Sequence, residues 1–201
     1  MTHMPINTRR GFLGLMAAGT CLAVTPARAM TADTATAAIQ RAVDEVFAII
    51  NSGAAPAQMY QQFEGVFARH ADVAAIARSA LGPAAREVDQ ATFAQFRTAM
   101  SGYISRKYGK RFREFIGSRI EVGGARQVKS FWSVGSTAYL NGRSPMQVEW
   151  HVSDKTGQPR FFNLIIEGVN MLASEREEIR AMLARRKGDV RAVIADLQHA
   201  G

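Results

Sequence analysis

The sequence contains almost no cysteine. Cys21 is the only one, and it lies in a segment that we expect to be removed. The mature chain should therefore have no disulfide bond, no cysteine metal cluster and no thiol nucleophile. The apolar segment around it, from Phe12 to Val24, holds about thirteen residues, fewer than the roughly 20 that a membrane-spanning helix needs. No repeat, low-complexity tract or long linker interrupts the chain.

The first 29 residues have the three regions of an export signal in the expected order. Thr8-Arg9-Arg10-Gly11-Phe12-Leu13 is a twin-arginine pattern, the apolar segment follows, and Ala27-Arg28-Ala29 is a cleavage box. We therefore expect a twin-arginine signal peptide over residues 1–29, cleaved near Ala29, and a protein located in the periplasm. Residues 30–201 are enough for a single domain with a substantial core.

The chain is basic, with a formal net charge of +8 and a pI of about 10.2. Such a charge also suits nucleic acid, but the export signal argues against that partner. The densest basic run lies between residues 106 and 113. Charges of this kind contribute about 1 kcal/mol each near an anionic membrane leaflet, whereas a solvated helix face is the alternative. The candidate headgroup or membrane contacts are Arg106, Lys107, Lys110 and Arg111.

The stretch from Pro145 to Ser174 predicts a β-hairpin. Its first half alternates apolar and polar residues, which is typical of a strand with one buried face. The apolar members are Met146, Val148, Trp150 and Val152. Turn residues at 154–157 follow, so residues 160–167 should fold back as a second strand. We expect one face of that strand to carry Phe162, Leu164 and Ile166.

Helical periodicity dominates the chain before these strands. We expect helices over residues 37–51, 58–70, 73–81 and 90–116, and two further strands over 119–128 and 131–140. The longest helix has apolar residues at a steady 3–4 spacing, namely Phe93, Phe96, Met100, Tyr103, Ile104, Tyr108, Phe112 and Phe115. Gly102 and Gly109 inside it are candidate flexible points. After Gly168, a capping box at Ser174–Glu177 should open a helix, and Asp189 should cap the last one.

Helices followed by an antiparallel meander make this an α+β fold. We expect N-terminal helices packed on a C-terminal antiparallel sheet of about four strands, an NTF2-like cone with a helical extension, closed by C-terminal helices.

Four segments together resemble the MlaC family, the periplasmic phospholipid-binding components of the Mla transport system, also called toluene-tolerance proteins. They are FEGVFARHADVAAIARSALG, FAQFRTAMSGYISRKYG, PMQVEWHV and FFNLIIEGVNML. Many members carry an Asp and a Ser where this chain has Asn163 and Asn170. A hopanoid-associated branch is also similar.

The resemblance implies a non-enzymatic carrier without a cofactor. Its cargo would be phospholipid, and it would shuttle between an outer-membrane lipoprotein complex and an inner-membrane ABC transporter with an MCE-domain ring, maintaining outer-membrane lipid asymmetry. Such a carrier needs an apolar cavity, although each apolar residue taken alone is better explained as part of a close-packed core, because aromatic stripes are usually core. The candidate lining residues are Phe67, Phe96, Met100, Tyr103, Tyr108, Phe112, Val148, Trp150, Phe162, Leu164, Ile166 and Met171.

Two other functions are compatible with the residues. Glu149 and His151 are two apart on one strand and share a face, so they could serve as acid and base in a small NTF2-like enzyme. They lie opposite Trp150 and Val148, and no Gly-x-Ser-x-Gly elbow or His-rich metal spacing accompanies them. The third possibility is an envelope adaptor with a filled core and no ligand.

Overall fold

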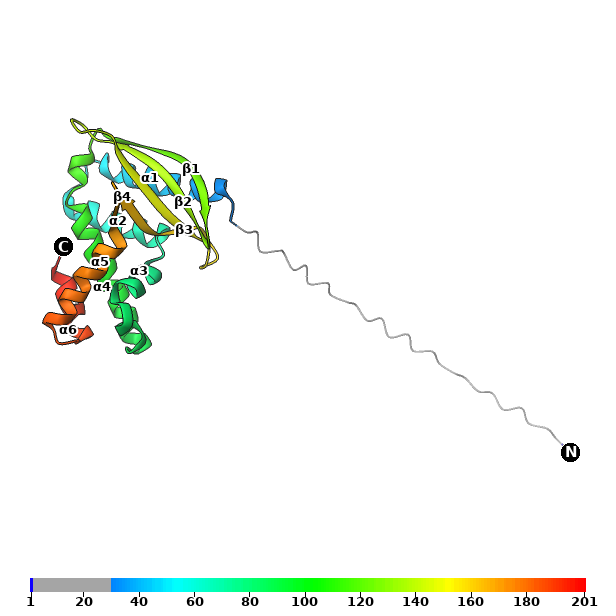
Figure 1. Ribbon diagram of the computed structural model, residues 1–201, viewed down its shortest axis with the longest axis vertical. Coiled ribbons are helices and arrows are strands. Elements are labelled where there is room, and N and C mark those ends of the chain that lie inside the picture. The colour runs from blue at the N-terminus through cyan, green and yellow to red at the C-terminus, as the bar shows by residue number, and fades with distance from the viewer. Residues whose placement is uncertain (2–29) are drawn as a thin grey trace.

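The computed structural model describes Met1 and residues 30–201, apart from the side chains of Phe112 and Arg113. The expected signal peptide falls on residues 2–29 and so lies outside the described residues. Figure 1 shows a curved sheet with α1 along one face and the remaining helices gathered beside and below it. The fold is α+β, as the sequence predicts.

The helices come in two groups, one before the sheet and one after it. The first group is α1 (Ala32–Ile50), α2 (Pro56–His70), α3 (Val73–Leu81), the 3-10 turn η1 (Gly82–Arg86), α4 (Gln90–Gly109) and the 3-10 turn η2 (Phe112–Phe115). The second group is α5 (Met171–Arg185) and α6 (Val190–His199). α6 packs against α4, and α5 packs against α3 and the sheet, so the C-terminal pair closes the fold onto the N-terminal helices.

The sheet is an antiparallel meander with the strand order β1-β2-β3-β4-β5. Its strands are β1 (Arg119–Val128), β2 (Phe131–Tyr139), β3 (Met146–Ser153), β4 (Arg160–Ile166) and β5 (Val169–Asn170). The two-residue β5 adds a fifth strand to the four that the sequence predicts. α1 packs against β1, β2 and β3, and the link between α2 and α3 joins β4 through Asp72, whose backbone N–H donates to the Phe161 carbonyl at 2.8 Å.

A β-bulge in β4 changes which aromatic ring faces the helices. The register shifts between His151 and Val152, so Phe161 pairs with Val152 while Leu164 pairs with Trp150. Phe161 therefore shares the inner face with Trp150 and Leu164, because directly paired residues point to the same side. Phe162 is the extra residue, and its ring centroid lies 5.8 Å from that of His151. Simple alternation from Leu164 and Ile166 would leave Phe161 off their face, and it does not anticipate the bulge that brings Phe161 onto it.

The longest helix ends earlier than its periodicity predicts. α4 stops at Gly109, and the chain continues through η2 instead of remaining helical to residue 116. A Cβ at Gly109 would lie 2.7 Å from Cδ1 of Tyr60, so the glycine allows α2 and α4 to approach closely. We attribute the glycine at this position to that close contact between the two helices.

α5 begins three residues earlier than the expected capping box. Asn170 is its N-cap, and its side-chain oxygen accepts the Ala173 N–H at 3.0 Å. Ser174 and Glu175 consequently lie inside the helix. Met171 and Glu175 are one turn apart, so they share a side of α5.

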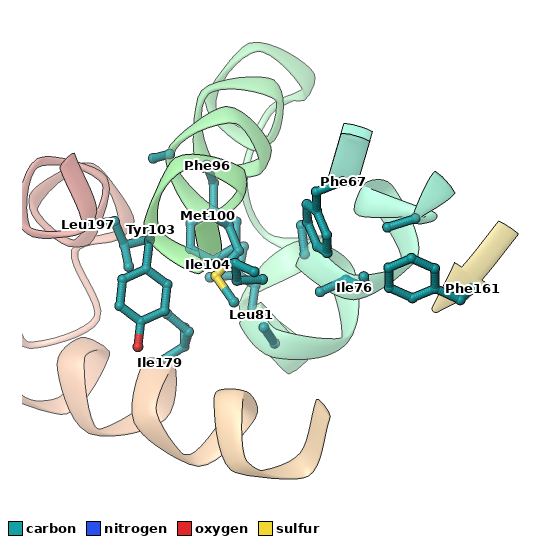
Figure 2. Packing of buried hydrophobic residues seen from close by; sticks show 14 of the residues in the cluster. Phe67, Ile76, Leu81, Phe96, Met100, Tyr103, Ile104, Phe161, Ile179 and Leu197 are labelled. Carbon is teal, nitrogen blue, oxygen red and sulfur yellow. The ribbon is translucent and has the colours of Figure 1, made fainter. Parts of the chain in front are cut away.

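The buried apolar residues form two clusters of unequal size. The main cluster, whose helical part is drawn in Figure 2, joins α1, α2, α3, α4, α5, α6 and the inner face of the sheet. The satellite cluster is Ile49, Ile50, Met59 and Val66, packed against Val46, Ala54, Phe63 and Phe115. This cluster lies where the C-terminal end of α1, helix α2 and the turn η2 meet.

Candidate functional site

An apolar cavity of about 240 Å³ lies between the two clusters. One wall is the inner face of β1, β2, β3 and β4, and the opposite wall is formed by α1, α2, α3, α4 and α5. The turn η2 contributes Phe115. The complete lining is Ala42, Val46, Phe47, Ile50, Phe63, Val66, Phe67, Ile76, Ile104, Tyr108, Phe115, Ile120, Ala138, Met146, Val148, Trp150, Phe161, Phe162, Asn163, Leu164, Ile166, Met171, Leu172 and Glu175.

Aromatic rings give the sheet side of the cavity its shape. Trp150 and Phe161 pack edge to face at 5.4 Å between ring centroids, and Phe161 meets Phe67 of α2 in the same way at 5.9 Å. The indole N–H of Trp150 donates to the Ser136 hydroxyl at 2.8 Å. Since this bond satisfies the one polar atom of the ring, the indole presents an apolar surface to the cavity.

The structure brings together eight of the twelve residues expected to line a cavity. They are Phe67, Tyr108, Val148, Trp150, Phe162, Leu164, Ile166 and Met171. The side chain of Phe112 lies outside the described part of the chain. Phe96, Met100 and Tyr103 lie away from the cavity, with at most 1% of their surface exposed. Figure 2 shows their side chains in the packing between α4, α5 and α6.

These three residues lie in the core because α4 is surrounded by other elements. Small residues on its remaining sides, such as Ala99, Ser101 and Ser105, are buried too. A helix that is buried all round has no single apolar face that points to one neighbour. The apolar side chains of α4 are therefore shared between the core and the cavity. Only Ile104 and Tyr108, one turn apart, reach the cavity.

One buried carboxylate borders the cavity, and sequence analysis missed it. Glu175 is 4% exposed, and its Oε1 accepts hydrogen bonds from Tyr108 Oη at 2.6 Å and from Lys107 Nζ at 2.9 Å. Lys107 also donates to Glu178 at 2.6 Å and to the Tyr103 hydroxyl at 2.9 Å. The spacing of Met171 and Glu175 is the sequence signal that could have found it, but the residue was interpreted as part of a capping box.

The pKa values of Lys107 and Tyr108 in this network are both raised. Burial would lower the pKa of Lys107, but its bonds to Glu178 and Glu175 outweigh that effect and raise it. Burial, followed by the bond to Glu175, raises the pKa of Tyr108 far above its usual value. Tyr108 is therefore a neutral donor, and Lys107 is a cation between two carboxylates.

The family model described as MlaC protein matches residues 40–199. The chain belongs to the MlaC family. Among solved structures, a phospholipid-binding protein from Ralstonia solanacearum, determined in complex with a phospholipid, has the same fold with a TM-score of 0.71. The two chains share 18% sequence identity, and the match covers 82% of this chain and 95% of the other. No curated protein sequence matches the chain.

The four basic residues expected to contact headgroups all form hydrogen bonds or ion pairs with other residues of this MlaC-family protein. Arg106 donates to the backbone carbonyls of Ala200 at 2.9 Å and Leu197 at 2.5 Å. Lys110 donates to the Gly201 carbonyl, and Arg111 pairs with Glu114 at 3.2 Å. Lys107 is held in the network beside the cavity. Arg106 and Lys110 thus attach the end of α4 to the last residues of the sequence, and headgroup contact stays a prediction.

Glu149 and His151 lie on the outer face of the MlaC-family sheet, away from the cavity. The Glu149 carboxylate accepts from Ser133 Oγ at 2.6 Å and Arg126 at 3.1 Å, and His151 Nε2 lies 3.1 Å from the same oxygen. The bond from Ser133, followed by that from His151, lowers the pKa of Glu149. Since Ser133 contacts the carboxylate and not the imidazole, the three do not form a nucleophile–base–orienter chain.

Asn163 and Asn170 stand where many family members have other residues, and both have structural partners. Asn170 caps α5, while the Asn163 side-chain oxygen accepts the Leu172 N–H at 3.0 Å. Within residues 30–201, no group of three or more His, Cys, Asp or Glu side chains could hold a metal ion. No helix in that part of the chain is long and apolar enough to cross a membrane.

Proposed function

We propose that this protein is a periplasmic carrier that binds the acyl chains of a phospholipid in the cavity between helices and sheet. The observation that carries the proposal is the apolar cavity in a chain of the MlaC family. The phospholipid held by the Ralstonia solanacearum protein of the same fold supports the choice of cargo. The carrier would move lipid between an outer-membrane lipoprotein complex and an inner-membrane ABC transporter, and so maintain outer-membrane asymmetry.

Energetics explain why such cargo needs a carrier. A diacyl phospholipid has roughly 30 methylene-type groups, each worth about 0.8 kcal/mol when it leaves water. Free passage of the lipid through water is therefore negligible. The lining of the cavity is almost wholly apolar, and Met146 and Met171 provide side chains that adapt to variable chains.

The cavity has to enlarge to accept this cargo. Its volume of about 240 Å³ is below the ~300–1,000 Å³ of ordinary small-molecule pockets. The satellite cluster forms one side of the cavity, whereas the main cluster holds the rest of the fold together. Movement of the α1–α2 corner with Phe115 would widen the cavity and leave the main cluster in place.

The test is lipid extraction and mass spectrometry of the protein exported to the periplasm and purified without detergent. We expect phospholipid near one molecule per chain. A hopanoid in its place would support the carrier function but assign the protein to the transport of a different lipid. Protein that is reproducibly empty, and that takes up no lipid from vesicles, would overturn the proposal and favour an adaptor.

The enzyme alternative predicts a different dependence on the outer face. Replacing both Glu149 and His151 with alanine would abolish an acid–base activity, but a carrier with its cavity on the inner face should retain its lipid. Loss of lipid from this double variant, with an unchanged fold by circular dichroism, would contradict the cavity assignment. Trp150→Asp, on the inner face of the same strand, is the matched positive control.

A further inference from the structure

The carboxylate of Glu175 has one oxygen that is bonded and one that is not. Oε1 accepts from both Lys107 and Tyr108. Oε2 is buried and has no hydrogen-bond partner in the described part of the chain. A buried acceptor without a partner is costly, and a charged one more so. An oxygen in this state at the wall of a ligand cavity points to a donor supplied by the ligand.

The other polar side chains along the cavity already have partners. The amide of Asn163 is bonded to the Leu172 N–H and to His151. The indole N–H of Trp150 is bonded to Ser136, and the Tyr108 hydroxyl donates to Glu175. Glu175 Oε2 is therefore the one unsatisfied side-chain acceptor among the described lining residues.

Its place in the fold suits a lipid headgroup better than an acyl chain. Lys107 and Glu178 belong to the same network, and their side chains are 30% and 43% exposed. The network thus runs from the cavity wall to solvent, between the last turn of α4 and the first turns of α5. Val169, just before α5, is 55% exposed, and Ile116, just after η2, is 52% exposed, so this end of the cavity is close to the surface.

The charge of the network selects among possible donors. Within the hydrogen-bonded network the two carboxyl groups of Glu175 and Glu178 outnumber the one cation, Lys107, and the further cation Arg185 acts on the outer carboxyl group, Glu178. An anionic headgroup would be repelled, whereas a cationic donor would complete the set. A primary ammonium has both the charge and the N–H groups, and a quaternary ammonium has the charge without the N–H.

We propose that Glu175 is a headgroup-recognition residue that accepts a hydrogen bond from a primary ammonium, so that the protein prefers phosphatidylethanolamine-type lipids to phosphatidylcholine-type lipids. This inference rests on the carrier function proposed above. It goes beyond that function because it assigns selectivity for the headgroup to a single side chain.

The experiment is a competition on vesicles. Lipid-free protein is incubated with vesicles of dioleoyl phosphatidylethanolamine and dioleoyl phosphatidylcholine in equal amounts, re-isolated, and its bound lipid counted by mass spectrometry. We expect ethanolamine lipid to be enriched about tenfold, the ratio that corresponds to about 1.4 kcal/mol. A second vesicle set with mono- and dimethylated ethanolamine lipids keeps the charge and removes N–H groups one at a time. Enrichment over choline should persist until the last N–H is lost.

Two variants separate recognition from structural support. Glu175→Gln should bind the same total lipid with a ratio near one, because the amide places no charged acceptor at the Oε2 position. Glu178→Gln alters the same network at its solvent side and should keep most of the enrichment. Melting curves of both variants check the fold, and the methylation series on the wild type needs no variant at all.

Each remaining outcome overturns a different statement. Equal binding of the two lipids by the wild type, or an unchanged preference in Glu175→Gln, would refute recognition by Glu175 and leave the carrier intact. Preference for dioleoyl phosphatidylglycerol over the ethanolamine lipid would refute the ammonium assignment. Absence of bound lipid of every headgroup would refute the carrier itself.

Discussion

A substitution that fills the cavity tests whether this interior is hollow. Ala42 of α1 is buried and lines the cavity. Leucine adds three carbons there, which remove apolar surface from water without a need to displace neighbours. At about 0.8 kcal/mol per carbon the gain is about 2.4 kcal/mol, and the lost rotamer freedom of leucine costs ~0.5–1 kcal/mol. We expect Ala42→Leu to raise the free energy of unfolding by about 1.5 kcal/mol.

The matched control lies two turns earlier on the same side of α1. Ala35 is fully buried in the main cluster and does not border the cavity. Leucine at that position overpacks a filled region, so Ala35→Leu should lower the free energy of unfolding by about 1–3 kcal/mol. Both alanines are helical and the new side chain is the same, so helix propensity does not separate the two variants.

Urea unfolding of lipid-free protein measures the difference. In thermal melts, Ala42→Leu should raise Tm by about 3–6 °C, given ~2–4 °C per kcal/mol for a chain of this size. The same variant should carry less lipid, because the new side chain occupies space that the acyl chains need. Equal destabilisation by both substitutions would show that the space beside Ala42 cannot be used, and the hollow interior would be refuted.

Three further perturbations give distinct results. Trp150→Asp should fold yet lose its lipid, since a carboxylate replaces an apolar wall; a folded variant that purifies with stoichiometric lipid would contradict this. Gly109→Ala should lower the free energy of unfolding by about 1–3 kcal/mol, because the new Cβ would lie 2.7 Å from the Tyr60 ring. Adding Tyr60→Ala should restore most of that stability. An unchanged free energy of unfolding in the single variant would show that the ring moves freely. The bond to Lys107 helps to hold the pKa of Glu178 below 4.5, although burial opposes it. The stabilisation from Glu178 is therefore present above that pH and is lost as the pH falls through the pKa of Glu178 in the folded protein. The difference in urea midpoint between wild type and Glu178→Gln should accordingly narrow below pH 4.5. A difference that stays constant with pH would refute this linkage.

The sheet was predictable from sequence because local chemistry determines it. Alternation from Met146 to Val152, followed by turn residues at 154–157, specifies a hairpin without reference to the rest of the chain, and β3 and β4 follow it closely. The bulge at Phe162 was not predictable, since nothing in the alternation indicates where an extra residue leaves the ladder. One such residue decides which of two adjacent phenylalanines meets Trp150.

The helical side of the cavity was harder to predict for a tertiary reason. The stripe through Phe96, Met100 and Tyr103 has the same periodicity whether it faces a cavity or a neighbouring helix. Which of the two it faces depends on the positions of α5 and α6, and these helices belong to the C-terminal part of the sequence. Glu175 was missed for a related reason. Its hydrogen-bond partners, Lys107 and Tyr108, lie 68 and 67 residues away in sequence.

The division of the apolar interior into two clusters has a consequence for cooperativity. Without cargo, the satellite cluster at the α1–α2 corner and the main cluster face each other across an open space. Acyl chains in that space would touch both clusters at once and make one continuous interior. The lipid would then be a removable part of the protein's own core, and the loaded and empty forms would differ in how much of the chain unfolds as a unit.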